Sequence, residues 1–437
     1  MHYPESKKEL QEIIKAAREK GTALVPVSSG APHIHGISQN DKAETVDMSR
    51  MNNILKISRH DRYARVEVGV TFGDLIPEMA KNGLRLNAPF LPRANKSAIA
   101  SALEREAVLV PKYQYDYTDP LLTTEVVFGT GDEFRTGSAS GPGTYEELKA
   151  DMVSPWGPGT IDYLRFIMGA QGTMGIVTWG TLKAEVMPSD SKLFFIEAED
   201  ISVLTKLTNE LLRYRTLDDC IILNSVNLAK AFADNDEEEQ KILEKASPWT
   251  LICRICGFDR YPEKRIEIYE GYLKDYCAKF DVSPKSAPFG DEALAAKIDK
   301  MLWDCDRRET YWKMRRGDVR EILFLTPPSK APELTAALKN AVSAHPEKDV
   351  GITLQPQVQG RAFRIECDLF CENAAKIEEL AYNAERELLK KGAYFDRPYG
   401  KLCEDIYTMD PTGTDSLKKI KNIFDPDGIF NPGKLCF

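Results

Sequence analysis

The sequence predicts an α+β protein with two domains, and three observations support this. The chain has 437 residues, more than one hydrophobic core usually serves. Helical and strand patterns alternate up to about residue 187, and a second series follows Met187-Pro-Ser-Asp-Ser191, a stretch typical of a hinge. Hydrophobic residues make up 43% and charged residues 29% of the chain, which is ordinary globular composition.

The region before the hinge is built from short elements. Residues Ser6 to Lys20 are amphipathic and predict a helix, and Ala23-Leu-Val-Pro-Val27 predicts a buried strand. Ala64-Arg-Val-Glu-Val68 alternates with period two, as strands do, and residues 72 to 82 predict a helix that ends at Gly83. Short strands with intervening helices are typical of an α+β or α/β domain.

The region after the hinge has strands and helices of its own. Lys192-Leu-Phe-Phe-Ile-Glu197 predicts a strand, and Ile201 to Tyr214 predicts an amphipathic helix. Residues 249 to 257 predict another strand, in which Cys253 and Cys256 face opposite sides of the pleat because they are three positions apart. That spacing, without nearby histidines, predicts no metal site.

The composition excludes several classes of partner. Lys and Arg number 58 and Asp and Glu 67, a net charge of −9 without any basic block, so we expect no nucleic-acid partner. No run approaches the roughly 18 apolar residues of a membrane span, and Met1 to Lys20 lacks the apolar core of a signal peptide. The nine cysteines form no secreted-type framework, which favours a reducing cytoplasm.

A loop of small residues follows the first predicted strand, within Val25-Pro-Val-Ser-Ser-Gly-Ala-Pro-His-Ile-His-Gly36. Its small residues are Ser28, Ser29, Gly30, Ala31 and Gly36. Backbone N–H groups can neutralise a pyrophosphate only where the backbone approaches it closely, which favours small residues after a strand. The loop is therefore a candidate phosphate-binding loop, and a plain surface turn is the alternative.

This loop opens a series of five elements in a fixed order. The next four are Val66-Glu-Val-Gly-Val-Thr-Phe-Gly-Asp-Leu75, Ala102-Leu-Glu-Arg105, residues 125–137, and Gly169 to Thr178. The series, with Asn431-Pro-Gly-Lys434 near the end, resembles the vanillyl-alcohol oxidase and 4-cresol dehydrogenase family. The resemblance implies a two-lobed PCMH-type FAD-binding domain over residues 1–187 and a second α+β cap (substrate) domain over 188–395. Residues 396–437 would return to the FAD domain.

The resemblance also implies which residues contact FAD. In the family the backbone of the segment that matches Gly169 to Thr178 lies against the flavin or its adenosine, which would explain small residues there. The expected cofactor contacts are Ser28, Ser29, Gly30, Ala31, His33, His35, Gly36, Ser97, Ser101, Gly172, Thr173, Gly175, Ile176 and Val177.

The second loop departs from the family pattern. The family has glycines on both sides of the Ala-Leu-Glu-Arg element, where this chain has Ala94-Asn-Lys-Ser97 before it and Glu106-Ala107 after it. Pro92-Arg93 stand where the phenol-oxidising members carry a base carboxylate. Either FAD sits in a modified loop or its binding is weakened, so a flavin-free subunit of an electron-transfer complex stays an alternative.

Histidine usage favours non-covalent FAD. Many relatives bond the flavin to a histidine, but the matching loop position holds Pro32 and the matching cap position falls near Ile322. Neither side chain can form that bond. His33 or His35 could instead donate a hydrogen bond to the cofactor.

Candidate catalytic residues lie in two further segments. Phe395-Asp-Arg-Pro-Tyr-Gly-Lys401 resembles segments of the phenol oxidases and of the sugar and aldonolactone oxidases, so Arg397, Tyr399 and Lys401 are expected to contact substrate or the flavin anion. Tyr113 and Tyr115 follow Val110-Pro111, where relatives place a tyrosine beside the flavin. In the cap, Arg315 or Arg316 could face an anionic substrate, although a solvated basic turn is the favoured alternative for both.

The resemblance implies an FAD-dependent oxidoreductase that takes a hydride from a small alcohol, a 4-alkylphenol or a benzylic alcohol. A D-2-hydroxy-acid dehydrogenase and a sugar or lactone oxidase are the alternatives within the fold. We also expect an electron acceptor, either dioxygen or an electron-transfer protein, and a homo-oligomer.

Overall fold

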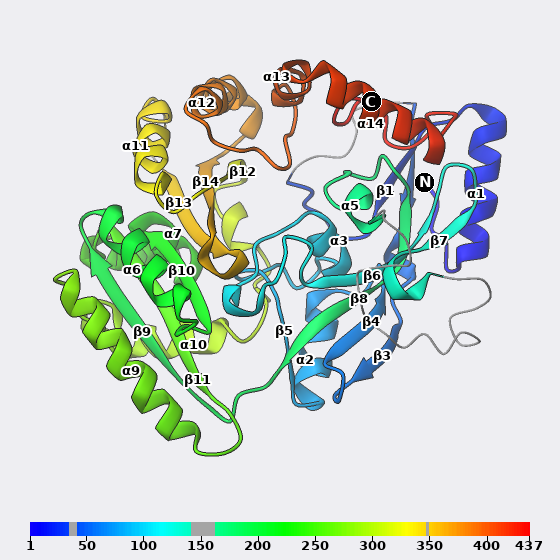
Figure 1. Cartoon of the computed structure of the whole chain (residues 1–437). Helices are drawn as coiled ribbons and strands as arrows, with labels where there is room; N and C mark the ends of the chain where they lie inside the picture. Colours follow the sequence, from blue (N-terminus) through cyan, green and yellow to red (C-terminus); the bar gives the residue numbers. More distant parts are fainter. Residues whose placement is uncertain (35–41, 141–161, 347–348) are drawn as a thin grey trace.

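The computed structural model describes residues 1–34, 42–140, 162–346 and 349–437, so the predicted contacts His35 and Gly36 lie outside the described residues. Two large β-sheets, each with its own helices, form two lobes, and a small two-stranded sheet adds to the first lobe (Figure 1). The first lobe's large sheet ends at Val186, before the predicted hinge, whereas the second lobe's sheet begins at Asp190, within the last residues of that hinge. The predicted α+β architecture is confirmed.

The first lobe combines a small parallel sheet with a larger antiparallel one. Strand β1 pairs with β2, and the larger sheet has the order β3-β4-β8-β6-β7, with β5 paired to β8. Its elements are α1 (Lys7–Lys20), β1 (Leu24–Val27), β2 (Glu44–Asp47), β3 (Ile54–Ser58), β4 (Tyr63–Glu67), α2 (Phe72–Lys81), β5 (Leu84–Leu86), α3 (Ala98–Leu103), β6 (Leu121–Val127), β7 (Glu133–Arg135), α5 (Leu164–Ile167) and β8 (Ile176–Val186).

Helix α1 shows how the sequence specifies one of these elements. It begins where the Ser6 side chain accepts a hydrogen bond from the Glu9 N–H, and it ends at Gly21, whose φ of 65° is left-handed. Leu10 and Ile14 on its apolar face are fully buried in the core of the first lobe. The predicted helix is confirmed.

The second lobe is built on an antiparallel sheet of six strands in the order β12-β14-β13-β10-β11-β9. Its elements are β9 (Asp190–Ala198), α6 (Ile201–Arg213), β10 (Asp219–Asn224), α7 (Ser225–Phe232), α8 (Asp236–Lys245), β11 (Trp249–Gly257), α9 (Pro262–Lys279), α10 (Glu292–Met301), β12 (Asp318–Thr326), α11 (Ala331–Ala341), β13 (Val350–Gln357), β14 (Ala362–Cys371) and α12 (Glu378–Lys390).

Strand β14 has two faces of opposite character. Phe363, Ile365 and Cys367 belong to the core that the sheet shares with α6, α9, α11 and α12, the last two of which lie along one side of this sheet in Figure 1. Arg364 and Glu366 alternate with them and therefore point to the other face. That face is polar although it is largely shielded from solvent.

The end of the chain lies against the first lobe. Helices α13 (Leu402–Met409) and α14 (Pro411–Phe424) lead into a segment that runs beside β1, where Leu24 and Phe430 form a parallel bridge. The Asn431 N–H donates to the Leu24 carbonyl at 2.8 Å, and Phe430 is fully buried in the first lobe's core. Within the described residues, the helices include none with the length and apolarity that a membrane crossing needs.

Candidate active site and cofactor cleft

A cavity of about 290 Å³ lies between the two lobes. Ser28, Ser29 and residues 174–177 contribute to its wall from the first lobe, and Glu321 and Glu366 contribute from the second. Loops and strand ends distant in sequence therefore meet at one partly open cleft, where binding sites commonly form.

The two predicted loops are hydrogen-bonded to each other at this cavity. The Gly30 N–H donates to the Asn95 carbonyl at 3.1 Å, and Arg93 Nη1 donates to the Gly30 carbonyl at 2.9 Å. Asn95 Nδ2 donates to the Ala31 carbonyl at 3.2 Å, and the Ser97 N–H donates to Ser29 Oγ at 2.9 Å. Gly30 and Ala31 thus join the second loop, while Ser28 and Ser29 line the cavity.

His33 also lies in the cavity wall. Burial lowers its pKa, and the neighbouring guanidinium of Arg93 lowers it further. The imidazole is therefore predominantly neutral near pH 7, so that it can donate one hydrogen bond and accept another.

The glycines of the predicted cofactor segments are required by contacts within the protein. A Cβ on Gly172, whose φ is +71°, would lie 2.6 Å from Pro26 Cγ, and one on Gly175 would lie 2.6 Å from Val126 Cγ2. A Cβ on Gly30 would lie 2.7 Å from Asn95 Nδ2. Close packing between segments accounts for these glycines, which revises the expectation that cofactor contact alone explains them.

Three predicted cofactor contacts lie behind the wall. Ser97, Ser101 and Thr173 are buried and do not line the large cavity. Ser97 caps α3 and donates to the Val68 carbonyl at 2.5 Å. Thr173 Oγ1 donates to the Ala170 carbonyl at 2.7 Å. These side chains hold the wall in shape, while Gly172, Gly175, Ile176 and Val177 form part of its surface.

The residues that replace the family's loop glycines form a charge cluster in the wall. Lys96 Nζ lies 2.8 Å from Glu104 Oε2 and 2.5 Å from Glu106 Oε1, and Ser101 Oγ donates to Glu106 at 2.5 Å. Burial alone would raise the pKa of Glu106, but Lys96 and Arg397 outweigh it and hold the pKa at about 2. Lys96 and Glu106 neutralise each other, and the cavity stays open beside them.

This cluster should make the fold sensitive to acid. The pKa of Glu106 is lower in the folded than in the unfolded chain, so its contribution is present above the unfolded value and is lost as pH falls toward 2. The shift corresponds to about 3 kcal/mol at neutral pH. We expect Glu106→Gln to lower the free energy of unfolding at pH 7, and the difference from wild type to shrink as pH is lowered in urea titrations. A difference that does not change with pH would contradict this reasoning.

Arg397 and Tyr399 lie in the cavity wall, as expected of residues that contact a ligand. Arg397 is 4% exposed, and its Nη1 donates to the Glu104 carbonyl at 2.6 Å. Its Nε has no hydrogen-bond partner. A buried guanidinium with an unused donor fits a site that receives negative charge.

The other predicted catalytic residues lie outside the cavity wall. Lys401 has a side chain that is 62% exposed and pairs with Glu379 at 3.4 Å. Tyr115 is 72% exposed, and Tyr113 lies half-buried beside Lys112. In the structure described here, neither tyrosine reaches the cavity.

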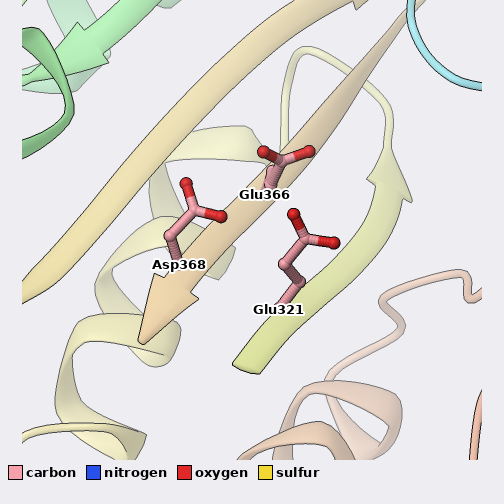
Figure 2. Close-up of side chains that lie close together, drawn as sticks. All are labelled: Glu321, Glu366 and Asp368. Carbon is pink, nitrogen blue, oxygen red and sulfur yellow. The ribbon is translucent and has the colours of Figure 1, made fainter. Parts of the chain in front are cut away.

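The roof of the cavity contains charged residues that the sequence analysis missed. Lys313 lines it together with Glu321 of β12 and with Arg364 and Glu366 of β14. Figure 2 shows Glu321, Glu366 and Asp368 directed toward one another across the two strands. The alternation in Arg364-Ile-Glu-Cys-Asp368 was the available signal, since it describes a strand with one apolar and one charged face.

The two cap arginines considered as substrate ligands are directed elsewhere. Arg315 donates to the Ala233 carbonyl at 3.1 Å and pairs with Asp236 at 3.0 Å, and Arg316 pairs with Asp349 at 3.3 Å. Their neighbour Lys313 is the basic residue of this turn that faces the cavity.

The wall offers polar atoms that nothing in the protein satisfies. Arg397 Nε, Arg364 Nε, Trp312 Nε1 and Asn431 Oδ1 are buried, lack a hydrogen-bond partner and belong to residues of the cavity wall. Buried polar groups normally have partners. Three donors and one acceptor around one cavity fit a polar ligand with several acceptor atoms, and the isoalloxazine and phosphates of FAD supply such atoms.

Comparison with known proteins agrees with this geometry. The sequence profile of the FAD binding domain matches residues 1–137, and that of the C-terminal domain of FAD linked oxidases matches residues 405–435. The glycolate oxidase subunit GlcD of Bacillus subtilis (strain 168) is 23% identical, over 99% of this chain and 87% of its own length.

Two solved structures share the fold over almost the whole chain. The 4-ethylphenol oxidase of Gulosibacter chungangensis aligns with a TM-score of 0.82 at 18% identity, over 99% of this chain and 88% of its own. The p-cresol methylhydroxylase aligns with a TM-score of 0.83 at 17% identity, and the alignment covers 100% of this chain and 88% of that structure's chain.

The fold, the cleft and the two matching domain profiles define an FAD-linked oxidoreductase. The chain matches the FAD binding domain profile and has the two-domain, PCMH-type fold of the 4-ethylphenol oxidase and the p-cresol methylhydroxylase. This agrees with the predicted resemblance to the vanillyl-alcohol oxidase and 4-cresol dehydrogenase family.

Proposed function

We propose that the chain is an FAD-dependent oxidoreductase that takes a hydride from a small alcohol, a 4-alkylphenol or a benzylic alcohol. The observation that carries this proposal is the cavity between the lobes, whose wall residues include buried donors without a hydrogen-bond partner. FAD, when bound, supplies the acceptor for the two electrons. The residues of the wall bind and orient the substrate, exclude water, and stabilise the charge that develops.

Aromatic side chains support an aromatic substrate. Phe90, Tyr311 and Trp312 line the cavity, with ring centroids 6.0 Å apart for Phe90 and Trp312 and 5.8 Å apart for Tyr311 and Trp312. Such rings pack well against a benzylic or phenolic ring. Arg397 and Tyr399 would then bind its oxygen.

A D-2-hydroxy acid is the second candidate. The full-length similarity to a glycolate oxidase subunit favours it, and Arg364 Nε is a buried donor with no partner that could receive a carboxylate. Arg364 already pairs with Asp396 at 2.9 Å, so its charge is largely used within the protein.

We propose Ser28, Ser29 and His33 of the first loop and Gly172, Gly175, Ile176 and Val177 near β8 as the cofactor contacts. We propose residues 1–187 as the FAD-binding domain, 188–395 as the cap domain and 396–437 as the returning segment. Ile322 supports non-covalent FAD, because it is fully buried in the core on the far side of the sheet from the cavity.

The visible spectrum of the purified protein tests this proposal. We expect flavin absorption, released into the supernatant by acid precipitation, because neither Pro32 nor Ile322 can bond the cofactor. Anaerobic mixing with 4-alkylphenols and benzylic alcohols should bleach that absorption, whereas bleaching by 2-hydroxy acids alone would favour the second candidate. A colourless protein that takes up no added FAD would exclude both.

The remaining expectations concern partners. An electron acceptor, either dioxygen or an electron-transfer protein, must reoxidise the cofactor. Rates of reoxidation by air and by an artificial acceptor distinguish these. We also propose a homo-oligomer in the cytoplasm.

A further inference from the structure

Three carboxyl groups share one ammonium group in the roof of the cavity. Lys313 Nζ lies 2.5 Å from Glu321 Oε1 and 2.9 Å from Asp368 Oδ1, and it also contacts Glu366. The three acidic side chains come from β12 and β14 and point toward one another (Figure 2). Their arrangement follows from strand register, because Glu321 is directly opposite Asp368.

The charges that face this cluster leave it with an excess of acid. Arg364, which lies two residues before Glu366 on β14, forms an ion pair with Asp396 at 2.9 Å. Strand β13 contributes Thr353 and Gln355, which do not titrate. Tyr311 and Glu106 add a buried phenol and a carboxylate, and burial raises the pKa of Tyr311. Among the described residues, Lys313 is therefore the cation that the three acids share.

Such a cluster can take up a proton readily. Carboxylates that share a site cannot all be ionised at low cost, so their protons belong to the group as a whole. Burial and the neighbouring carboxylates of Glu366 and Glu321 together raise the pKa of Asp368 to about 7, against the opposing effect of Lys313. The cluster thus binds and releases a proton near neutral pH.

Only part of the cluster faces the cavity. Asp368 is fully buried and accepts a hydrogen bond from Asn227 Nδ2 at 2.8 Å. Glu321 has a side chain that is 7% exposed, whereas the side chain of Glu366 is 24% exposed and lines the cavity. A substrate in the cavity therefore meets Glu366 first, with Asp368 behind it.

We propose that Glu366 is the catalytic residue that accepts the hydroxyl proton of the alcohol, and that Lys313 is its positioning residue. This inference rests on the proposed function. The O–H bond of the substrate breaks and its proton moves to a Glu366 oxygen, while the C–H electron pair leaves as a hydride to the FAD cofactor and a carbonyl forms.

Glu366→Gln tests the assignment, with Glu333→Gln as matched control because Glu333 is an exposed carboxylate in the first turn of α11. The holoenzyme is mixed anaerobically with a compound that bleaches the wild-type flavin. We expect Glu366→Gln to slow flavin reduction about 100-fold or more, with unchanged FAD content and substrate Kd. The pH profile of reduction should also differ from that of the wild type, because the substitution removes one of the three carboxyl groups that share Lys313.

An infrared difference spectrum gives a readout independent of rate. Reduction of the wild type and of Glu333→Gln should produce a carboxylic acid C=O band, and Glu366→Gln should lack it. Equal rates, pH profiles and bands in Glu366→Gln and wild type would overturn the inference. If Glu366→Gln does not fold, Glu366→Asp is tested instead. A rate of flavin reduction that is lower by about 10-fold or more supports the assignment of Glu366 as the base, because a base displaced by one methylene reacts poorly. A wild-type rate in Glu366→Asp overturns the assignment.

Failure of the proposed function gives a different result. If no alcohol of any class bleaches the wild-type flavin, the function and this inference are both wrong. If an alcohol does bleach it and Glu366→Gln behaves like Glu333→Gln, only the assignment of the base is wrong.

Discussion

Arg397→Lys is expected to fold and to retain FAD, but to reduce its flavin about 100-fold more slowly than wild type with the same alcohol. Lysine keeps the positive charge beside Glu106 and Asp396. It lacks the planar fork through which Nη1 reaches the Glu104 carbonyl while the buried Nε stays without a hydrogen-bond partner. Stopped-flow reduction, with substrate Kd measured from the flavin spectrum, separates a loss of rate from a loss of binding.

Arg397→Ala is expected to do more damage. It leaves the buried Glu106 with Lys96 as its remaining cationic partner in this cluster, and removing one partner of a buried charge cluster costs on the order of 3 kcal/mol. Urea unfolding should show that loss, while Arg386→Ala, a half-exposed arginine on α12, should change neither stability nor reduction. If Arg397→Lys reduces its flavin at the wild-type rate, Arg397 does not contribute to charge stabilisation.

Gly172→Val is expected to weaken FAD retention by about 100-fold or more, equivalent to roughly 2.7 kcal/mol. The added Cβ would lie 2.6 Å from the Pro26 ring. Either the residues that precede β8 or the end of β1 must therefore move. Both segments line the cavity. The positive φ of 71° adds strain for a β-branched residue. FAD titration of the apoprotein measures the effect.

Gly131→Val separates the steric collision with Pro26 from the backbone strain of a positive φ. Gly131 also has a positive φ, of 89°, but a Cβ there meets nothing within 4 Å. This control suffers the backbone strain without the collision, so it should bind FAD as the wild type does. Equal FAD affinity in Gly172→Val and Gly131→Val would show that the packing of Gly172 on Pro26 does not shape the cofactor site.

The fold was predictable because its signals are local. Helix α1 is predicted by Ser6, an apolar stripe and Gly21. The buried strand β11 is predicted by the mainly apolar residues from Trp249 to Gly257. Each pattern lies within about 20 residues of chain, where periodicity and capping act. The order of such elements then carried the family resemblance.

The site was predictable only where it is made of single segments. The first loop, the residues before β8 and Arg397 were all identified from contiguous motifs. The roof was not, because Lys313, Glu321 and Glu366 meet only through the pairing of β12 with β14 and the fold of the preceding turn. Register between strands some 45 positions apart depends on tertiary packing rather than on local pattern.

The glycine positions show a second limit of prediction from sequence. The sequence predicted close approach of the backbone to a cofactor at Gly30, Gly172 and Gly175, but the atoms that exclude a side chain there belong to Asn95, Pro26 and Val126. A glycine in a sequence indicates that the backbone makes a close contact at that position, but not which residue or ligand lies against it.

The segment beside β1 has a consequence for biosynthesis. Phe430 bridges to Leu24, Lys421 Nζ donates to the Thr173 carbonyl at 2.6 Å, and Asn431 and Lys434 line the cavity. A nascent chain emerging from the ribosome would lack these contacts until residues 421–434 had been translated. The first lobe should consequently complete its cofactor cleft only after about 400 further residues have followed β1.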